Sequence, residues 1–249
     1  MMARLFCATF YSRMKNILAA ATFIFAIDSC NARQEISLEA GGGGIARLEV
    51  ALHPVFMSYY TDLAAGFSAS VPPGFFNVDA IREGFRRNKE LELVNLANTG
   101  KGKLTLDFRI KDIAAAIKNE NPAALSIIRR SVAQGRETLL IWLDKGNLAS
   151  LLAVVPEMDA PAVKMLLPPA AMSEKEYGEH LAWALEDYSK DGKILDVLGS
   201  AVIDIVLRTP SKIIAQTGGV QKGEKELRFA IPVLRLLTLE KPIEFSVTY

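Results

Sequence analysis

The stretch LTLDFRI, residues 104–110, decides the fold, because it alternates apolar and polar residues without a break. Leu104, Leu106, Phe108 and Ile110 fall on one side of an extended chain, and the residues between them fall on the other. This period of two is typical of a strand with one buried face and one face in water. The segment therefore predicts an antiparallel sheet that is covered on one side.

Other segments repeat the pattern and predict hairpins. Residues 35–39 and 45–52 alternate on either side of a turn of four glycines. No Gly-Lys-Ser/Thr motif follows these glycines, so we interpret them as a turn rather than as a phosphate-binding loop. Residues 91–96, 201–208, 227–231 and 243–249 are further predicted strands.

Helix signals lie between the strands. Asn77 is placed to cap a helix that ends at Arg87, and residues 173–176 form a capping box for a helix up to about residue 189. Asp112 is placed to cap a short helix, and Asn121-Pro122 predicts another that ends near Ala133.

These elements predict an α+β fold, a mostly antiparallel sheet of hairpins packed against several helices, over residues 35–249. A similar order of elements in residues 35–136 and 137–249 raises the hypothesis of a tandem β-α-β-β duplication. The length fits either one large domain or two small ones.

The N-terminal segment predicts where the protein resides. Residues 14–30 read MKNILAAATFIFAIDSC, in which Lys15 precedes an apolar run from Ile17 to Ile27. A charged residue, a short apolar run and a small residue before the cut are typical of a secretory signal peptide. The run is too short for a membrane-spanning helix, which needs about 20 apolar residues. Residues 1–29 are therefore predicted to be removed.

The end of this leader resembles a bacterial lipobox. Ile27-Asp28-Ser29-Cys30 has an aliphatic residue three places before the cysteine and a small residue directly before it. The resemblance implies that Cys30 takes a diacylglycerol, that the new amine is acylated, and that residues 30–34 are a lipidated tether. Asp28 departs from the usual pattern and suggests a lineage with a relaxed lipobox, such as spirochaetes. The alternative is an ordinary cleaved signal peptide with an incidental cysteine.

Composition restricts the classes of function. Residues 1–29 hold three basic residues and one acidic residue, so residues 30–249 carry 26 basic and 27 acidic residues. A net charge of −1 argues against nucleic acid as a partner. The only cysteines are Cys7 and Cys30, which leaves the folded part without a disulfide or a cysteine nucleophile.

Residues 148–172 are low in charge and rich in Leu, Val, Met and Pro. Adaptable methionines and short broken helices suit an apolar groove for acyl chains or a protein partner, and the alternative is a helical layer over the sheet. The residues expected to line the groove are Leu151, Leu152, Val155, Met158, Met165 and Leu166.

The motifs of common enzymes are missing from the sequence. Two histidines, His53 and His180, are present, and no Gly-x-Ser-x-Gly elbow accompanies them. No His-Glu-x-x-His motif or EF-hand loop occurs. Scattered carboxylates (Asp107, Asp112, Glu186, Asp187) form no recognisable acid/base pair. We therefore expect neither catalysis nor a cofactor or metal.

The C-terminal part combines a proline, glycines, an amphipathic strand and a final apolar strand, in Pro210, Ile213-Ile214, Gly218-Gly219, residues 227–232, Leu236-Leu237, Lys241-Pro242 and residues 247–249. In these residues it resembles the end of LppM-type bacterial lipoprotein domains. The resemblance implies an envelope lipoprotein with an α+β domain and no catalytic residues. The predicted function is thus a lipid-anchored, non-catalytic cell-envelope module, on the periplasmic or surface face, that binds lipid or an envelope protein. The alternative is a secreted or envelope hydrolase of unrecognised type.

Overall fold

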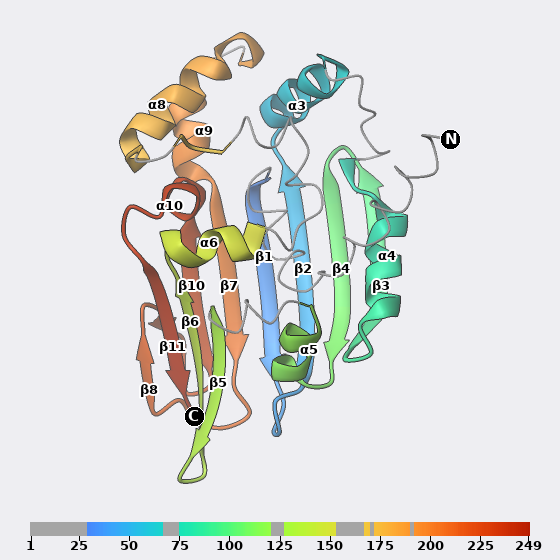
Figure 1. Cartoon of the computed structure of the whole chain (residues 1–249), viewed down its shortest axis with the longest axis vertical. Coiled ribbons are helices and arrows are strands. Elements are labelled where there is room, and N and C mark those ends of the chain that lie inside the picture. Colours follow the sequence, from blue (N-terminus) through green and yellow to red (C-terminus); the bar gives the residue numbers. More distant parts are fainter. Residues whose placement is uncertain (1–28, 67–74, 121–126, 153–166, 170–171, 190–191) are drawn as a thin grey trace, which may run out of the picture.

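The computed structural model describes residues 29–66, 75–120, 127–152, 167–169, 172–189 and 192–249 (Figure 1). The largest element among them is a seven-stranded sheet with the order β3-β4-β2-β1-β7-β10-β9. Its strands are β1 (Ser29–Leu38), β2 (Gly44–Leu52), β3 (Leu91–Gly100), β4 (Lys103–Ile110), β7 (Val202–Arg208), β9 (Val220–Gln221) and β10 (Glu226–Pro232). All neighbours are antiparallel except β1 and β7, which are parallel.

The alternating stretch at residues 104–110 is confirmed as β4, in the interior of this sheet. Its four apolar residues are buried, and Leu106 is fully enclosed. They pack with Ala46, Leu48 and Val50 of β2 and with Phe85, whose ring lies 5.4 Å from that of Phe108. The sheet therefore has one apolar face, as the period of two predicts.

A second sheet covers part of that apolar face. Its strands, in the order β5-β6-β11-β8, are antiparallel. They are β5 (Ile128–Ala133), β6 (Arg136–Leu143), β8 (Ala215–Thr217) and β11 (Ile243–Thr248). Phe245 of β11 meets Phe229 of β10 with 4.3 Å between ring centroids. The core between the two sheets continues into the helices that follow.

Helices cover further parts of the hydrophobic core. Figure 1 shows α3, α8 and α9 gathered at the end of the large sheet where β1 begins. The capping box is confirmed, because Ser173 Oγ accepts from the Glu176 amide and the Glu176 carboxylate accepts from the Ser173 amide. The helices are α3 (Pro54–Gly66), α4 (Val78–Arg87), α5 (Ile113–Glu120), α6 (Lys145–Leu152), α8 (Glu174–Ala184), η4 (Glu186–Tyr188), α9 (Ile194–Ser200) and α10 (Val233–Thr238).

The caps predicted for two other helices are confirmed. Asn77 Oδ1 accepts from the Ala80 amide at the start of α4. Asp112 Oδ1 accepts from the Ala114 and Ala115 amides at 2.8 and 3.0 Å at the start of α5. Side chains of this kind satisfy amides that the first helical turn leaves without a partner.

The helix expected from residue 122 to Ala133 is wrong in its described part, because residues 128–133 form β5. Gln134 and Gly135 both have positive φ angles, 52° and 73°, which suits the tight turn of a hairpin. Arg130 on β5 then meets Glu137 on β6 across this hairpin. The Gln134-Gly135 turn and the ion pair between Arg130 and Glu137 favour a β-hairpin, and this preference outweighs the helical signal of Asn121-Pro122.

Strand β1 is longer than the sequence indicates. It begins at Ser29, so residues 30–34, expected as a tether, lie inside the strand. Asn31 is already paired with Ala51 of β2 and Val202 of β7. The signal-peptide prediction for residues 1–29 concerns segments that lie, apart from Ser29, outside the described residues.

The predicted duplication is not confirmed. The boundary between residues 136 and 137 falls inside β6, and β1 of the first half pairs with β7 of the second. Both halves thus contribute strands to both sheets. Within the described residues, no helix is long and apolar enough to cross a membrane.

Arg130, Glu137 and Tyr249 form a polar cluster at the far end of the second sheet. Arg130 Nη2 donates to Glu137 Oε2 at 2.9 Å, and the Tyr249 hydroxyl donates to Oε1 at 2.7 Å. The guanidinium also packs against Gly42 (φ +91°), where a Cβ would lie 2.6 Å from Arg130 Cζ. Because of this positive φ and this close contact, position 42 in the four-residue turn requires glycine.

The hydrogen bond from Arg130 lowers the pKa of Glu137, while burial opposes this effect.

We predict that this cluster makes stability depend on pH. Because the folded pKa of Glu137 is lowered, its contribution is present above the unfolded pKa and is lost as pH falls through the folded value. Glu137→Gln should lower the free energy of unfolding at neutral pH by about 2 kcal/mol, as charged hydrogen bonds contribute. Urea titrations from pH 7 to pH 3 measure it. Tyr249→Phe, which keeps the ion pair, should retain most of the pH dependence; an unchanged pH profile in Glu137→Gln would contradict the prediction.

Candidate functional site

The second face of the large sheet is covered with charged side chains. They are the residues between the buried ones on each strand, so the alternation that builds the core also builds this face. The charged residues are Arg33, Glu35, Arg47, Glu49, Asp107, Arg109, Asp204, Arg208, Glu226 and Arg228. They come from five neighbouring strands, from β4 to β10.

Ion pairs cross the strands of this charged face. Arg208 lies at the centre of one chain, with 3.0 Å between Nη1 and Glu35 and 2.9 Å between Nε and Glu226. The hydrogen bond from Arg208 lowers the pKa of Glu35, and Arg33 adds to this effect. All of these side chains are at least 30% exposed, so each pair contributes about 1 kcal/mol or less. The pairs balance the charges on this face, and they contribute little to the free energy of folding.

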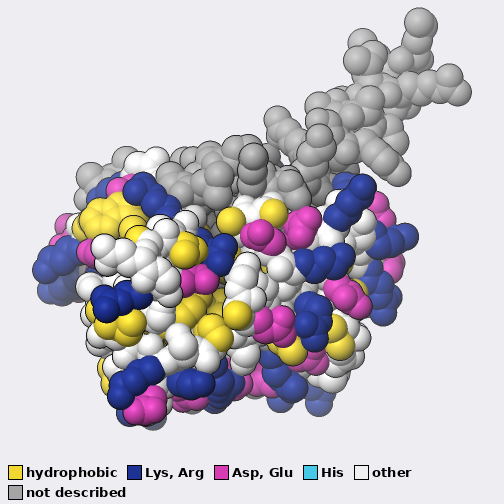
Figure 2. Space-filling view, turned by 90° about the horizontal axis from the view of Figure 1, so that it is seen from below, with side chains coloured by type: hydrophobic (Ala, Val, Ile, Leu, Met, Phe, Trp, Pro, Cys, Tyr) yellow, Lys and Arg dark blue, Asp and Glu magenta, His cyan; other side chains and the backbone are white. Residues whose placement is uncertain are grey.

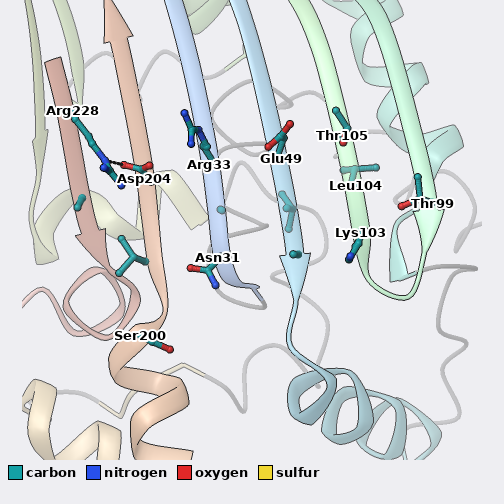
Figure 3. A pocket seen from close by; sticks show the side chains of 15 residues that line it. Asn31, Arg33, Glu49, Thr99, Lys103, Leu104, Thr105, Ser200, Asp204 and Arg228 are labelled. Atoms are coloured by element: carbon teal, nitrogen blue, oxygen red, sulfur yellow. Dashed lines mark hydrogen bonds and ion pairs between the residues drawn. The ribbon is translucent and has the colours of Figure 1, made fainter. Parts of the chain in front are cut away.

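A depression of about 720 Å³ occupies one end of the charged face (Figure 3). It lies where β1 and β7 begin and β2 ends. Figure 3 shows Arg33, Glu49 and the Asp204–Arg228 pair across its floor, with Lys103 and Thr99 at the β3–β4 side. The polar side chains that line it are Asn31, Arg33, Glu49, Thr99, Lys103, Thr105, Ser200, Asp204 and Arg228.

The depression is lined by both polar and apolar side chains, the apolar ones being Ala32, Val50, Ala51, Leu104, Val202 and Ala230. Glu49 is engaged by Arg47 at 2.8 Å, and Asp204 by Arg228 at 2.6 Å. Lys103 forms no ion pair with a described residue, so its charge is available to a ligand. Hydroxyl, amide and ammonium groups suit a phosphate or a sugar, whose oxygens accept and donate hydrogen bonds.

A second depression of about 780 Å³ lies between α3, η4 and α9 and shares Ser200 with the first. It contains His53, Ser58, Lys193 and Asp196. His53 Nδ1 accepts from the Val55 amide at 3.4 Å, and among the described residues no serine hydroxyl or carboxylate bonds to it. These groups are close without forming the hydrogen-bonded chain of a hydrolase.

The candidate residues predicted from the sequence lie mostly outside the region where side chains are described. Cys30 is the second residue of β1. Leu151 and Leu152 end α6, and Val155, Met158, Met165 and Leu166 lie outside the described residues. The apolar groove therefore stays a prediction.

The other residues considered at first have structural surroundings. Asp107 accepts from Asn95 Nδ2 on the charged face, and Asp112 caps α5. His180 lies on α8 with its ring 6.1 Å from that of Trp183. Among the residues described, no group of three or more His, Cys, Asp or Glu side chains is arranged to hold a metal ion.

Figure 2 shows the end of the molecule opposite to the two depressions. Basic and acidic side chains are interspersed there, and no broad area of one sign covers it. Hydrophobic side chains are visible between the charged ones.

The depression on the charged face escaped the sequence analysis. The alternation in the sequence predicts which residues of β2 and β4 point outward, but it does not predict the order of the strands in the sheet. The pairing of Asn31 with Val202 brings together residues that are far apart in the chain, and no local signal announces a parallel pair.

Comparisons with known proteins give weak similarity. No protein-family model matches the chain, and no curated protein matches it in sequence. Among solved structures, the NMR structure of the Mycobacterium tuberculosis LppM folded domain is similar with a TM-score of 0.39 and 9% identity. The match covers 88% of this chain and 87% of that one. The neighbour is of the LppM type that the C-terminal part resembles, but a likeness this weak supports no inference about function.

We predict that the charged face contributes little to stability. Glu35→Gln should lower the free energy of unfolding by about 1 kcal/mol at low salt, because two arginines lose a charged partner. High salt should reduce the difference, since exposed charges are screened. Urea titrations at two salt concentrations measure it, with Glu224→Gln, in an exposed pair with Lys212, as the control near zero. A loss that is several times larger and independent of salt would refute this.

Proposed function

We propose that the protein is a lipid-anchored, non-catalytic module of a bacterial cell envelope. The single observation that carries the proposal is the apolar leader that ends at Ile27-Asp28-Ser29-Cys30, where β1 begins. The leader supplies an export signal, and its cysteine is the acceptor for the lipid. Two or three acyl chains hold a protein firmly at a bilayer, since each buried methylene contributes about 0.8 kcal/mol.

The proposed activity is binding, of lipid or of an envelope protein. Residues 148–172 offer a run of apolar side chains, with Leu151, Met158 and Met165 among them. Methionine suits a site that must adapt to a flexible acyl chain or to a partner surface.

The anchor is tested by mass spectrometry of the mature N-terminus, after expression of the full chain in a bacterium that processes lipoproteins. We expect residues 1–29 to be absent and Cys30 to carry a diacylglyceryl group, because the leader ends at this residue. Cys30→Ser should lose the lipid mass, and Cys7→Ser should keep it. A soluble mature chain with an unmodified Cys30, or a cytosolic chain that retains its leader, would refute the anchor.

The binding site is tested by extraction of the purified full-length protein with organic solvent. The solvent removes non-covalent lipid, while lipid on the Cys30 thioether stays with the chain. We expect a bound lipid in the extract, reduced severalfold in Met165→Asp, because a carboxylate in an apolar groove is costly to bury. Ile214→Asp, at a side chain that is 55% exposed, is the control. An extract without lipid, together with no captured envelope protein, would contradict the proposal.

A further inference from the structure

No flexible linker separates Cys30 from the large sheet, because Cys30 lies within β1. Asn31, the residue directly after Cys30, already pairs with Ala51 of β2 and with Val202 of β7. A strand advances about 3.3 Å per residue, so a lipid on Cys30 would hold this end of the sheet within a few ångströms of the bilayer surface. This step rests on the proposed function, because it needs the lipid on Cys30.

The β3–β4 turn, defined here as Lys101 and Gly102 together with Lys103 at the start of β4, lies beside that point. The Leu52 amide donates to the Gly102 carbonyl at 2.9 Å, so the turn is fastened to the residue that follows Ala51, the partner of Asn31. Gly102 (φ +70°) is packed so closely that a Cβ would lie 2.8 Å from Leu52 Cβ. Figure 3 shows Lys103 and Asn31 at the same end of the sheet. The turn would therefore face the bilayer together with Cys30.

The lysines of this turn differ from the arginines of the charged face. Lys101 and Lys103 are exposed, and neither forms an ion pair with a described residue. The arginines of the charged face, by contrast, are paired with carboxylates. Free cations next to the proposed anchor are complementary to the phosphates of a membrane surface.

Acidic side chains at the same end limit how much of it can approach such a surface. Glu186 and Asp187 lie on η4, and Asp196 lies on α9. α9 leads into β7, whereas η4 packs against α3 through Tyr188 and Tyr59. Exposed Asp62 lies on α3, which follows β2, so acidic side chains surround the turn on more than one side. The cationic contact therefore belongs to the turn and not to the whole end.

We propose that Lys101 and Lys103 of the β3–β4 turn bind the phosphates of anionic phospholipids in the membrane that holds Cys30. The lipid and the turn then form two contacts that fix how the sheet stands on the bilayer. Each lysine near an anionic surface raises the equilibrium constant for such a contact by about fivefold, so the two together raise it by about 25-fold.

The test measures which end of the molecule lies near the headgroups. The mature chain has no free thiol apart from Cys30, which the lipid occupies, so a fluorophore can be placed on Thr99→Cys or on Ser211→Cys at the opposite end. The full-length protein, processed in cells, is reconstituted into phosphatidylcholine vesicles with or without phosphatidylglycerol and a headgroup-labelled acceptor lipid. We expect stronger energy transfer from residue 99 than from residue 211, and an increase with phosphatidylglycerol.

Removal of the lysines supplies the decisive comparison. Lys101→Ala/Lys103→Ala should abolish the increase with phosphatidylglycerol, whereas Lys89→Ala/Lys222→Ala, two exposed lysines at the opposite end, should retain it. Equal transfer from residues 99 and 211 in vesicle-bound, lipidated protein would overturn the inference and leave the anchor intact. The same holds for an increase that survives removal of Lys101 and Lys103. A mature chain without lipid would overturn both proposals.

Discussion

The position of β1 between β2 and β7 is the constraint on which the rest of the structure depends. This one strand joins β2, β4 and β3 to the C-terminal strands, by antiparallel pairing on one side and parallel pairing on the other. Ile36 of β1 packs against both hydrophobic clusters. Without β1 in this place, the charged face would be divided, and the chain of ion pairs from Glu35 to Arg208 and Glu226 could not form.

The two faces of the sheet have different tasks because of this arrangement. The apolar face supplies the hydrophobic free energy of folding, and helices and the second sheet cover it. The charged face presents partly exposed ion pairs to the solvent. The outer strands are also protected against unwanted pairing, because β9 has two residues and β3 carries irregularities between Leu93 and Asn95 and between Asn98 and Gly100.

Local signals in the sequence predicted the elements that local physics determines. The alternation of residues 104–110, the cap at Asn77 and the capping box at Ser173 all correspond to the observed elements, because each depends on neighbours within a few residues. Strand β5 was assigned to a helix, because Asn121-Pro122 resembles a helix start and the Gln134-Gly135 turn was not recognised. The candidate site was beyond prediction, since Asn31, Lys103 and Asp204 meet only through the order of the strands.

The parallel pair β1–β7 also determines when the protein can fold. Asn31 of β1 can pair with Val202 of β7 only after residue 202 has been synthesised. The middle of the large sheet therefore stays incomplete until most of the chain exists. Pairing between such distant residues is slow, because the entropy of closing the loop is lost before the contacts form. Under the export proposed above, this delay would keep the polypeptide unfolded while it crosses the membrane, and the C-terminal strands would complete the sheet afterwards.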